Sequence, residues 1–279
     1  MSKIIDYLVP INSVCNQKCI FCSAEYRMKS NSEIPLKIIF KQILEKDNYI
    51  QISWGEPLLD SRLEKILFFI RKAKPDAFIE LQTNAVFLKD KLDMLQKYNI
   101  NLYNVNYPSH IEEINDRVVW VKNTLKSREE AMKEVIRRWL NLRINIIINK
   151  LNYQILPEMI DYIKENFDWF ERIQLSFVKV MWGADKNWRN VVPSYEEASK
   201  FIIWALKKAS EYRFKVDIDH IPLCFLWNYY KFHVDYKKLK SGQVGVYMKE
   251  KTYIKKCDNC NLKQFCSWYR KDYLTLYNN

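Results

Sequence analysis

Three of the seven cysteines stand within eight residues near the N-terminus. They are Cys15, Cys19 and Cys22, in the spacing Cys-x3-Cys-x2-Cys. Three thiolates can hold three irons of a [4Fe–4S] cube and leave the fourth iron open to a small molecule. A zinc knuckle is the alternative, but three cysteines without a fourth nearby make a poor closed tetrahedral site. The spacing therefore favours an iron–sulfur cluster with one exchangeable position.

The other four cysteines, Cys224, Cys257, Cys260 and Cys266, lie in the last quarter of the chain. Four thiolates saturate one metal centre, and the spacing suits a closed cluster or a structural zinc site. If Cys224 is not a ligand, the other three thiolates leave one iron open to substrate and Cys224 is a free thiol. We favour four ligands, because an orphan reactive thiol is the rarer case.

Short β-like runs alternate with helical patterns, which predicts an α/β fold. The six expected strands cover residues 4–11, 49–54, 77–82, 102–106, 143–148 and 172–178. The β-branched run at 143–148 indicates a parallel strand buried on both faces. Capping pairs predict two of the helix starts, Ser127 with Glu130 and Ser194 with Glu197.

The pattern changes after residue 212. A strand is expected at 214–219 and a hairpin at 244–256, among the four later cysteines. We therefore predict two domains, residues 1–212 and a small cysteine-rich region over 213–279.

Composition narrows the class of protein. With 279 residues, of which 48% are hydrophobic, the chain can bury a sizeable core. No apolar run approaches the roughly 18 residues of a membrane span, and no signal peptide is visible, so we predict a cytoplasmic protein without a membrane partner. The net charge of +12 fits a lysine-rich surface, an acidic electron-transfer partner, an acidic leader peptide or nucleic acid.

The first cysteine loop, with Phe21 directly before Cys22, resembles the signature of the radical S-adenosylmethionine (SAM) superfamily. The resemblance implies a partial (β/α)6 TIM-type barrel and a [4Fe–4S] cluster whose open iron chelates the amino and carboxylate groups of SAM. Reduction of that cluster cleaves SAM to methionine and a 5′-deoxyadenosyl radical, which abstracts a substrate hydrogen.

A second motif, Gly55-Glu56-Pro57, is similar to the end of the family's Gly-Gly-Glu-Pro motif, which holds the methionyl amino group. Trp54 replaces the first glycine. Its indole must then point away from SAM or form a wall of the substrate site, and an aromatic residue of the core is an equal alternative.

Polar residues at other strand ends complete the set that the resemblance implies. Thr83 and Asn84 are similar to the family's Thr-Asn-Gly turn, Asn106 or Ser109 stands where a ribose-binding residue is common, and Asn149 matches a polar residue near the SAM carboxylate or ribose. Side chains at the C-terminal ends of parallel strands converge on one face, so we expect these residues around one site.

The later cysteines, Cys-x2-Cys-x5-Cys after an earlier Cys224, resemble the auxiliary region called twitch, a shortened SPASM region. This resemblance implies a second [4Fe–4S] cluster, with zinc as the alternative. It also implies that a free Cys224 would be a candidate hydrogen donor to a substrate radical, as in epimerases.

The substrate is the least determined feature. We predict hydrogen abstraction from a peptide or protein, leading to a cross-link, epimerisation or oxidation. The alternative is a small metabolite such as a sugar, aminocyclitol or nucleotide, and a tRNA-modifying enzyme or a non-catalytic zinc- and RNA-binding protein comes last. An acidic flavodoxin or ferredoxin would suit the basic surface as electron donor.

Two smaller expectations concern loop residues. Trp182, Trp188 and Arg189 follow the sixth expected strand and are candidates to grip a substrate, but for at least one of the tryptophans we favour packing against the C-terminal region. His110, His220 and His233 show no ligand spacing, and we expect each at the surface or in a turn.

Overall fold

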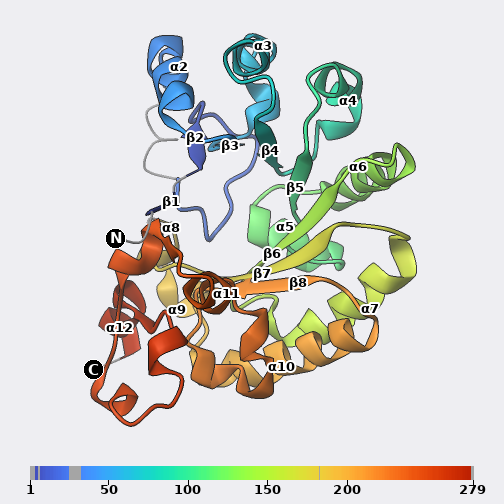
Figure 1. Ribbon diagram of the computed structural model, residues 1–279. Coiled ribbons are helices and arrows are strands. Elements are labelled where there is room, and N and C mark those ends of the chain that lie inside the picture. The colour runs from blue at the N-terminus through green and yellow to red at the C-terminus, as the bar shows by residue number, and fades with distance from the viewer. Residues whose placement is uncertain (1–3, 6, 25–32, 182, 278–279) are drawn as a thin grey trace.

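The computed structural model describes residues 4, 5, 7–24, 33–181 and 183–277. Its centre is a curved sheet of seven parallel strands in chain order (Figure 1). The strands are β2 (Leu8–Pro10), β3 (Tyr49–Ser53), β4 (Phe78–Thr83), β5 (Leu102–Asn106), β6 (Leu142–Ile148), β7 (Arg172–Phe177) and β8 (Val216–Asp219). This arrangement confirms the α/β class and the partial TIM-type barrel.

Helices cover the outer face of the sheet (Figure 1). They are α2 (Leu36–Glu45), α3 (Leu63–Ala73), α4 (Leu88–Gln96), α5 (Glu112–Val119), α6 (Leu125–Arg137), α7 (Leu156–Asn166) and α10 (Tyr195–Glu211). The predicted cap of α10 is confirmed, because the side chains of Ser194 and Glu197 each accept the other's backbone N–H. The cap predicted at Ser127 is wrong: α6 begins at Leu125, and the Ser127 hydroxyl donates to the Thr124 carbonyl.

The strands alternate between two environments. In β6, Leu142, Ile144 and Ile146 are fully buried against the helices, whereas Arg143 and Asn145 face the interior of the barrel. The prediction that this strand is buried on both faces is therefore wrong. The barrel interior is a cavity, so only one face of each strand packs into the apolar core.

The sheet continues past the predicted boundary at residue 212. Strand β8 pairs in parallel with β7, from Ile173 opposite Val216 to Ser176 opposite Asp219. The strand expected in the C-terminal region is thus the seventh strand of the barrel. The expected first strand is split, because only β2 joins the sheet and β1 (Ile4–Ile5) pairs with β9 (Val244–Gly245).

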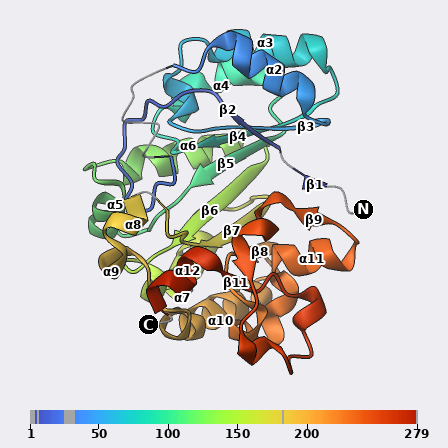
Figure 2. The same cartoon turned by 90° about the vertical axis from the view of Figure 1, so that its left-hand side faces the viewer.

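The C-terminal region contains short elements beside β8 and α10 (Figure 2). These are η3 (Leu223–Phe225), η4 (Trp227–Phe232), α11 (Val234–Lys240), η5 (Val246–Glu250), β10 (Lys251–Thr252), η6 (Lys255–Cys257), η7 (Lys263–Phe265), β11 (Tyr269–Arg270) and α12 (Lys271–Tyr277). The predicted hairpin at 244–256 is wrong, because β10 pairs with β11 and β9 pairs with β1. Stacking of Tyr273 on Tyr195, with ring centroids 3.7 Å apart, joins α12 to α10.

Within the described residues, no helix combines the length and apolar character required to cross a membrane. The cytoplasmic location stays a prediction.

Candidate active site

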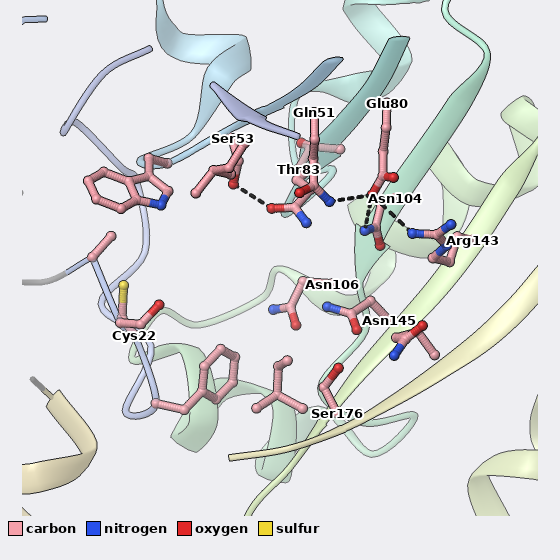
Figure 3. A pocket seen from close by; sticks show the side chains of 18 of the residues that line it. Cys22, Gln51, Ser53, Glu80, Thr83, Asn104, Asn106, Arg143, Asn145 and Ser176 are labelled. Atoms are coloured by element: carbon pink, nitrogen blue, oxygen red, sulfur yellow. Dashed lines mark hydrogen bonds and ion pairs between the residues drawn. The ribbon is translucent and has the colours of Figure 1, made fainter. Parts of the chain in front are cut away.

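A cavity of about 570 Å³ occupies the interior of the barrel. The first cysteine loop lines one end, and residues from β2 to β8 and from α11 line most of the rest (Figure 3). A volume in this range is typical of sites for small molecules.

All three N-terminal cysteines line this cavity. Backbone bonds hold the loop against the end of α5: Lys18 N–H donates to the Val119 carbonyl at 3.0 Å, and Ile20 N–H donates to the Val118 carbonyl at 2.9 Å. The pKa of the Cys19 thiol is raised, first by burial and then by the nearby Cys22 and Cys15. Cys15 and Cys22 therefore lie near enough to Cys19 to act on it electrostatically.

Two polar groups contact the Cys15 sulfur. Gln17 N–H donates to it at 3.4 Å, and the Asn84 Nδ2 lies 3.8 Å away. Burial is the main reason that the pKa of Cys15 rises to about 11. Buried thiols that repel one another as thiolates need a cation, which the irons of a cluster supply.

The donor set therefore fits a cluster with three cysteine ligands. Over the described part of the chain, no three His, Cys, Asp or Glu side chains converge closely enough to hold a single metal ion. A [4Fe–4S] cluster binds each cysteine to a different iron, so its ligands need not converge on one point. The fit rests on the type and burial of the three thiols and on the electrostatic effect of Cys15 and Cys22 on Cys19.

Gly55 brings the second motif against the cysteine loop. Its φ is +59°, and a Cβ atom there would lie 2.0 Å from Asn12 Oδ1 and 2.4 Å from the Val14 carbonyl oxygen. The adjacent Glu56 N–H donates to the same Val14 carbonyl at 2.7 Å, and Asn12 Nδ2 donates to the Glu56 carbonyl at 3.2 Å. Only glycine fits this approach.

Trp54 also has a positive φ, +74°, which is unusual for a bulky residue. It lines the cavity, so the interpretation as a wall of the site is favoured over an aromatic residue of the core.

The Glu56 carboxylate joins the second motif to the third. It is 1% exposed and accepts from Leu58 N–H at 3.1 Å, Thr83 Oγ1 at 2.7 Å and Asn84 N–H at 2.7 Å. Burial raises the pKa of Glu56, while the bonds from Asn84 and Thr83 oppose that rise. The carboxylate thus fixes the turn that carries Asn84 toward the cysteine loop.

Most of the predicted SAM-site residues share the cavity: Phe21, Gly55, Glu56, Thr83, Asn84 and Asn106 line it. Pro57 is buried in η1 (Pro57–Leu59) and does not line the cavity.

Asn149 also lies outside the lining, because its side chain bonds to the backbone of Ile147 and Leu151. The alternative Ser109 is buried and accepts from Ile111 N–H. The side chains of Asn149 and Ser109 therefore stabilise turns, and their contacts with SAM stay predictions.

Sequence reasoning missed the polar interior of the barrel. Besides the predicted Asn106, the polar residues that line it include Tyr49, Gln51, Ser53, Glu80, Gln82, Asn104, Arg143, Asn145, Gln174 and Ser176. The signal was present, because in each of these strands polar residues recur at every second position on the inward face.

Glu80 is the centre of that interior (Figure 3). Its carboxylate accepts from Gln51 Nε2 at 2.8 Å, Asn104 Nδ2 at 2.6 Å and Arg143 Nη1 at 3.1 Å, and also from the Tyr49 hydroxyl. Four strands therefore contribute to one buried network, which holds these side chains in fixed directions.

Lys179, Asp219 and His220 line the cavity beside the C-terminal region. The His220 Nε2 lies 3.6 Å from Asp219 Oδ1. Burial raises the pKa of Asp219 to about 6 and holds the pKa of His220 well below its usual value. His220 does occupy a turn, with a φ of +64°, but it faces the cavity.

The other two histidines have structural contacts. His233 is fully buried and its Nδ1 accepts from Asp235 N–H at 3.0 Å, which caps α11. The expected surface position is therefore wrong for His233. His110 is partly buried, with its ring 5.0 Å from that of Tyr162.

The later cysteines form a separate group. Burial, followed by the nearby Cys266, raises the pKa of Cys224 to about 11, and Cys260 adds to that rise. The pKa of Cys266 is raised by burial and by Cys257 and Cys260. These effects indicate that Cys224 lies near Cys266 and Cys260, and that Cys266 lies near Cys257 and Cys260. None of the four thiols lines the cavity.

The loop after β7 contains α8 (Gly183–Lys186) and α9 (Trp188–Val191). The Trp188 ring packs 5.7 Å from Tyr277 of α12, and the Arg189 guanidinium lies 4.8 Å from the Trp188 ring. Neither residue lines the cavity, and the contact of Trp188 with α12 confirms the predicted packing of a tryptophan against the C-terminal region. A grip on substrate stays a prediction. Trp182 lies outside the described residues.

Similarity to known proteins agrees with this site. The chain is 25% identical over 175 residues to a GTP 3′,8-cyclase of Sulfurimonas denitrificans, covering 58% of this chain and 53% of that protein. It is 25% identical over 191 residues to the GTP 3′,8-cyclase of Campylobacter lari, covering 64% and 56%. The chain thus spans about half the length of these curated relatives.

Solved structures share the fold at low sequence identity. Streptococcus suis SuiB bound to precursor peptide SuiA matches with a TM-score of 0.64 and 17% identity, over 82% of this chain and 52% of that one. Coproporphyrinogen III oxidase from Escherichia coli, a radical SAM enzyme, matches with a TM-score of 0.56 and 13% identity, over 75% and 53%.

The family model described as the Radical SAM superfamily matches residues 9–169. This family uses a [4Fe–4S] cluster and SAM. Because the match spans more than half of the 279 residues and includes all three cysteines of the first loop, the chain belongs to the radical SAM superfamily.

Proposed function

We propose that this enzyme abstracts hydrogen from a small polar metabolite, with a nucleoside or nucleotide as the substrate class that fits best. The observation that carries the proposal is the polar lining of the cavity, which comes from the inward faces of successive strands. Amide, hydroxyl and charged side chains at fixed positions suit a ligand with many hydrogen-bonding groups.

The relatives support the same class. The matched curated proteins carry the name GTP 3′,8-cyclase, which describes chemistry on a nucleotide. The sequence alone favoured a peptide or protein substrate instead. SuiB with its precursor peptide resembles this chain at 17% identity, which is a likeness of fold. The small-metabolite alternative is therefore the better supported.

Residues of this chain would divide the cavity between cofactor and substrate. Cys15, Cys19 and Cys22 would hold the cluster, and Gly55 and Asn84 lie beside them at the SAM end. When bound, the cluster and SAM supply the 5′-deoxyadenosyl radical. The Glu80 network would orient the substrate from the opposite side and limit the entry of water.

We also propose that the four later cysteines hold an auxiliary [4Fe–4S] cluster as a closed set, with zinc as the alternative. Grouping of Cys224 with the other three, away from the cavity lining, supports its role as a ligand. Residues 231–272 carry eleven Lys or Arg and four Asp or Glu. Such a basic region suits an acidic flavodoxin or ferredoxin as electron donor.

The substrate class is tested by isotope transfer. Reconstituted enzyme, SAM and dithionite are mixed with ribose-deuterated nucleosides and nucleotides, or with deuterated peptides, and deuterium in 5′-deoxyadenosine is measured. We expect transfer from at least one nucleoside or nucleotide. Transfer from peptides alone would show that the proposed class is wrong.

A substitution in the cavity gives a second prediction. Asn145→Leu removes a polar group from the middle of the lining at nearly constant size. We expect kcat/KM for the substrate to fall at least about tenfold, because one hydrogen bond to the substrate, worth about 1–2 kcal/mol, is lost. Asn48→Leu, at an exposed position, is the matched control. Equal kcat/KM values for the two variants would show that Asn145 does not bind the substrate.

A further inference from the structure

Arg128 of α6 is a buried cation behind the first cysteine loop. Its side chain is 0% exposed. Nε donates to the Asn84 carbonyl at 3.0 Å, and Nη1 donates to Asn115 Oδ1. Nη2 has no hydrogen-bond partner among the residues that the structure describes. One third of the guanidinium is therefore buried without an acceptor, which is costly for a charged group.

This guanidinium is connected to the cysteine loop through Asn84. The Asn84 Nδ2 donates to Asn16 Oδ1 at 2.7 Å and lies 3.8 Å from the Cys15 sulfur. Arg128 also lies close enough to Cys19 to oppose the rise in its pKa, and Cys19 is the strongest negative neighbour that acts on Arg128. The cation is thus linked to the cysteine loop through Asn84, whose carbonyl accepts from Arg128 and whose side chain contacts Asn16 and Cys15.

No carboxylate hydrogen-bonds to Arg128 in the described structure. Glu129 accepts from the hydroxyls of Tyr107 at 2.5 Å and Tyr162 at 3.1 Å instead. Glu56 interacts with Arg128 only through the electric field, after Cys19, Tyr107 and Glu129 in strength. A buried cation without a bonded carboxylate is stable only when other negative charge faces it.

A cluster held by three thiolates supplies that charge. Its doubly positive core and three thiolates carry one net negative charge when oxidised and two after one-electron reduction. The field of a nearby buried cation favours the more negative state, because little solvent screens it. Charge and hydrogen bonds around a cluster are known determinants of its reduction potential.

We propose that Arg128 is the buried counter-charge of the Cys15/Cys19/Cys22 cluster and that it raises the reduction potential of that cluster. The step is the uptake of one electron from an external low-potential donor, such as dithionite. Arg128 contacts neither SAM nor substrate in this role and acts through the field at the cysteine loop. The proposal goes beyond the substrate assignment and does not depend on it.

The test is a redox titration of the reconstituted cluster, followed by electron paramagnetic resonance, without substrate. Arg128→Met removes the charge, and Arg128→Lys keeps it but cannot reproduce both arginine hydrogen bonds. We expect Arg128→Met to reduce the one-electron equilibrium constant at least tenfold, a shift of about 59 mV to more negative potential. Arg128→Lys should stay within about threefold of wild type.

Two further variants keep the test decisive. Asn115→Asp retains an oxygen acceptor for Nη1 while neutralising the cation, so its potential should also become more negative. Arg62→Met is the control, because Arg62 already pairs with Asp60 at 2.8 Å and Glu33 at 3.2 Å. Its cluster should titrate like wild type.

Two results would overturn the proposal. One is a wild-type potential in Arg128→Met with full iron content; the other is an equal loss in Arg128→Lys and Arg128→Met, as expected of a packing role. If Arg128→Met fails to assemble the cluster, Asn115→Asp decides, and an unchanged potential there contradicts the proposal.

Discussion

Gly55→Ala is expected to reduce SAM cleavage at least 100-fold. A Cβ at this position would lie 2.0 Å from Asn12 Oδ1 and 2.4 Å from the Val14 carbonyl oxygen. The backbone of Val14 cannot yield without moving Cys15 beside it, so the collision displaces the cluster loop. Displacement of reacting groups by about 1 Å commonly costs a hundredfold in rate. The measurement is 5′-deoxyadenosine formed from SAM with dithionite, normalised to iron content.

Gly242→Ala is the matched control for this substitution. Gly242 has a similar φ of +73°, and a Cβ there meets no atom within 4 Å. Alanine at position 242 is therefore destabilised by the positive φ, by about 1–2 kcal/mol, but its Cβ collides with no other atom. We expect nearly normal SAM cleavage. Equal activities in the two alanine variants would contradict the close approach assigned to Gly55.

Glu56→Gln is expected to lower SAM cleavage at least 100-fold and the free energy of unfolding by about 2–4 kcal/mol. The carboxylate accepts from Leu58 N–H, Thr83 Oγ1 and Asn84 N–H, and it is almost fully buried. An amide replaces one acceptor oxygen with an NH₂ group that faces a donor. Buried donors left without acceptors cost about 1–3 kcal/mol each. Chemical denaturation and the SAM-cleavage assay measure the two effects.

Glu130→Gln is the control, because Glu130 makes an exposed ion pair with Lys89 at 3.1 Å. Exposed pairs contribute at most about 1 kcal/mol, so both stability and activity should remain close to wild type. A Glu56→Gln variant that behaves like Glu130→Gln would show that the Glu56 carboxylate does not support the site.

Most of the candidate site could be predicted from short local motifs in the sequence. The cysteine loop, Gly55-Glu56 and Thr83-Asn84 each follow a strand of a parallel sheet, and strand ends of such a sheet converge. Asn149 follows the same rule but bonds to the backbone of its own turn. An asparagine after a strand can point into the site or bond to the backbone of its own turn, and the sequence alone does not distinguish these two roles.

Long-range pairing explains most of the errors in the fold. The segments around Val216 and Lys251 have short β-like patterns, and their partners lie elsewhere in the chain, in β7 and β11. Arg128 gave no signal, because an arginine in a polar helix is normally exposed, and only the tertiary structure encloses it. The alternation of polar and apolar residues in the strands predicted a polar face of the sheet. That this face encloses a cavity follows only from the closure of the strands into a barrel.

The most direct test measures iron, zinc and deuterium transfer together, in anaerobically reconstituted wild type and in a triple Cys15→Ala, Cys19→Ala, Cys22→Ala variant. We expect about eight irons per wild-type chain, about four in the variant, and transfer of deuterium from a labelled nucleoside or nucleotide to 5′-deoxyadenosine in wild type alone. About four irons and one zinc in wild type would assign zinc to the later cysteines. Iron-dependent SAM cleavage that survives in the triple variant, or is absent from fully loaded wild type, would contradict the role given to the first cysteine loop.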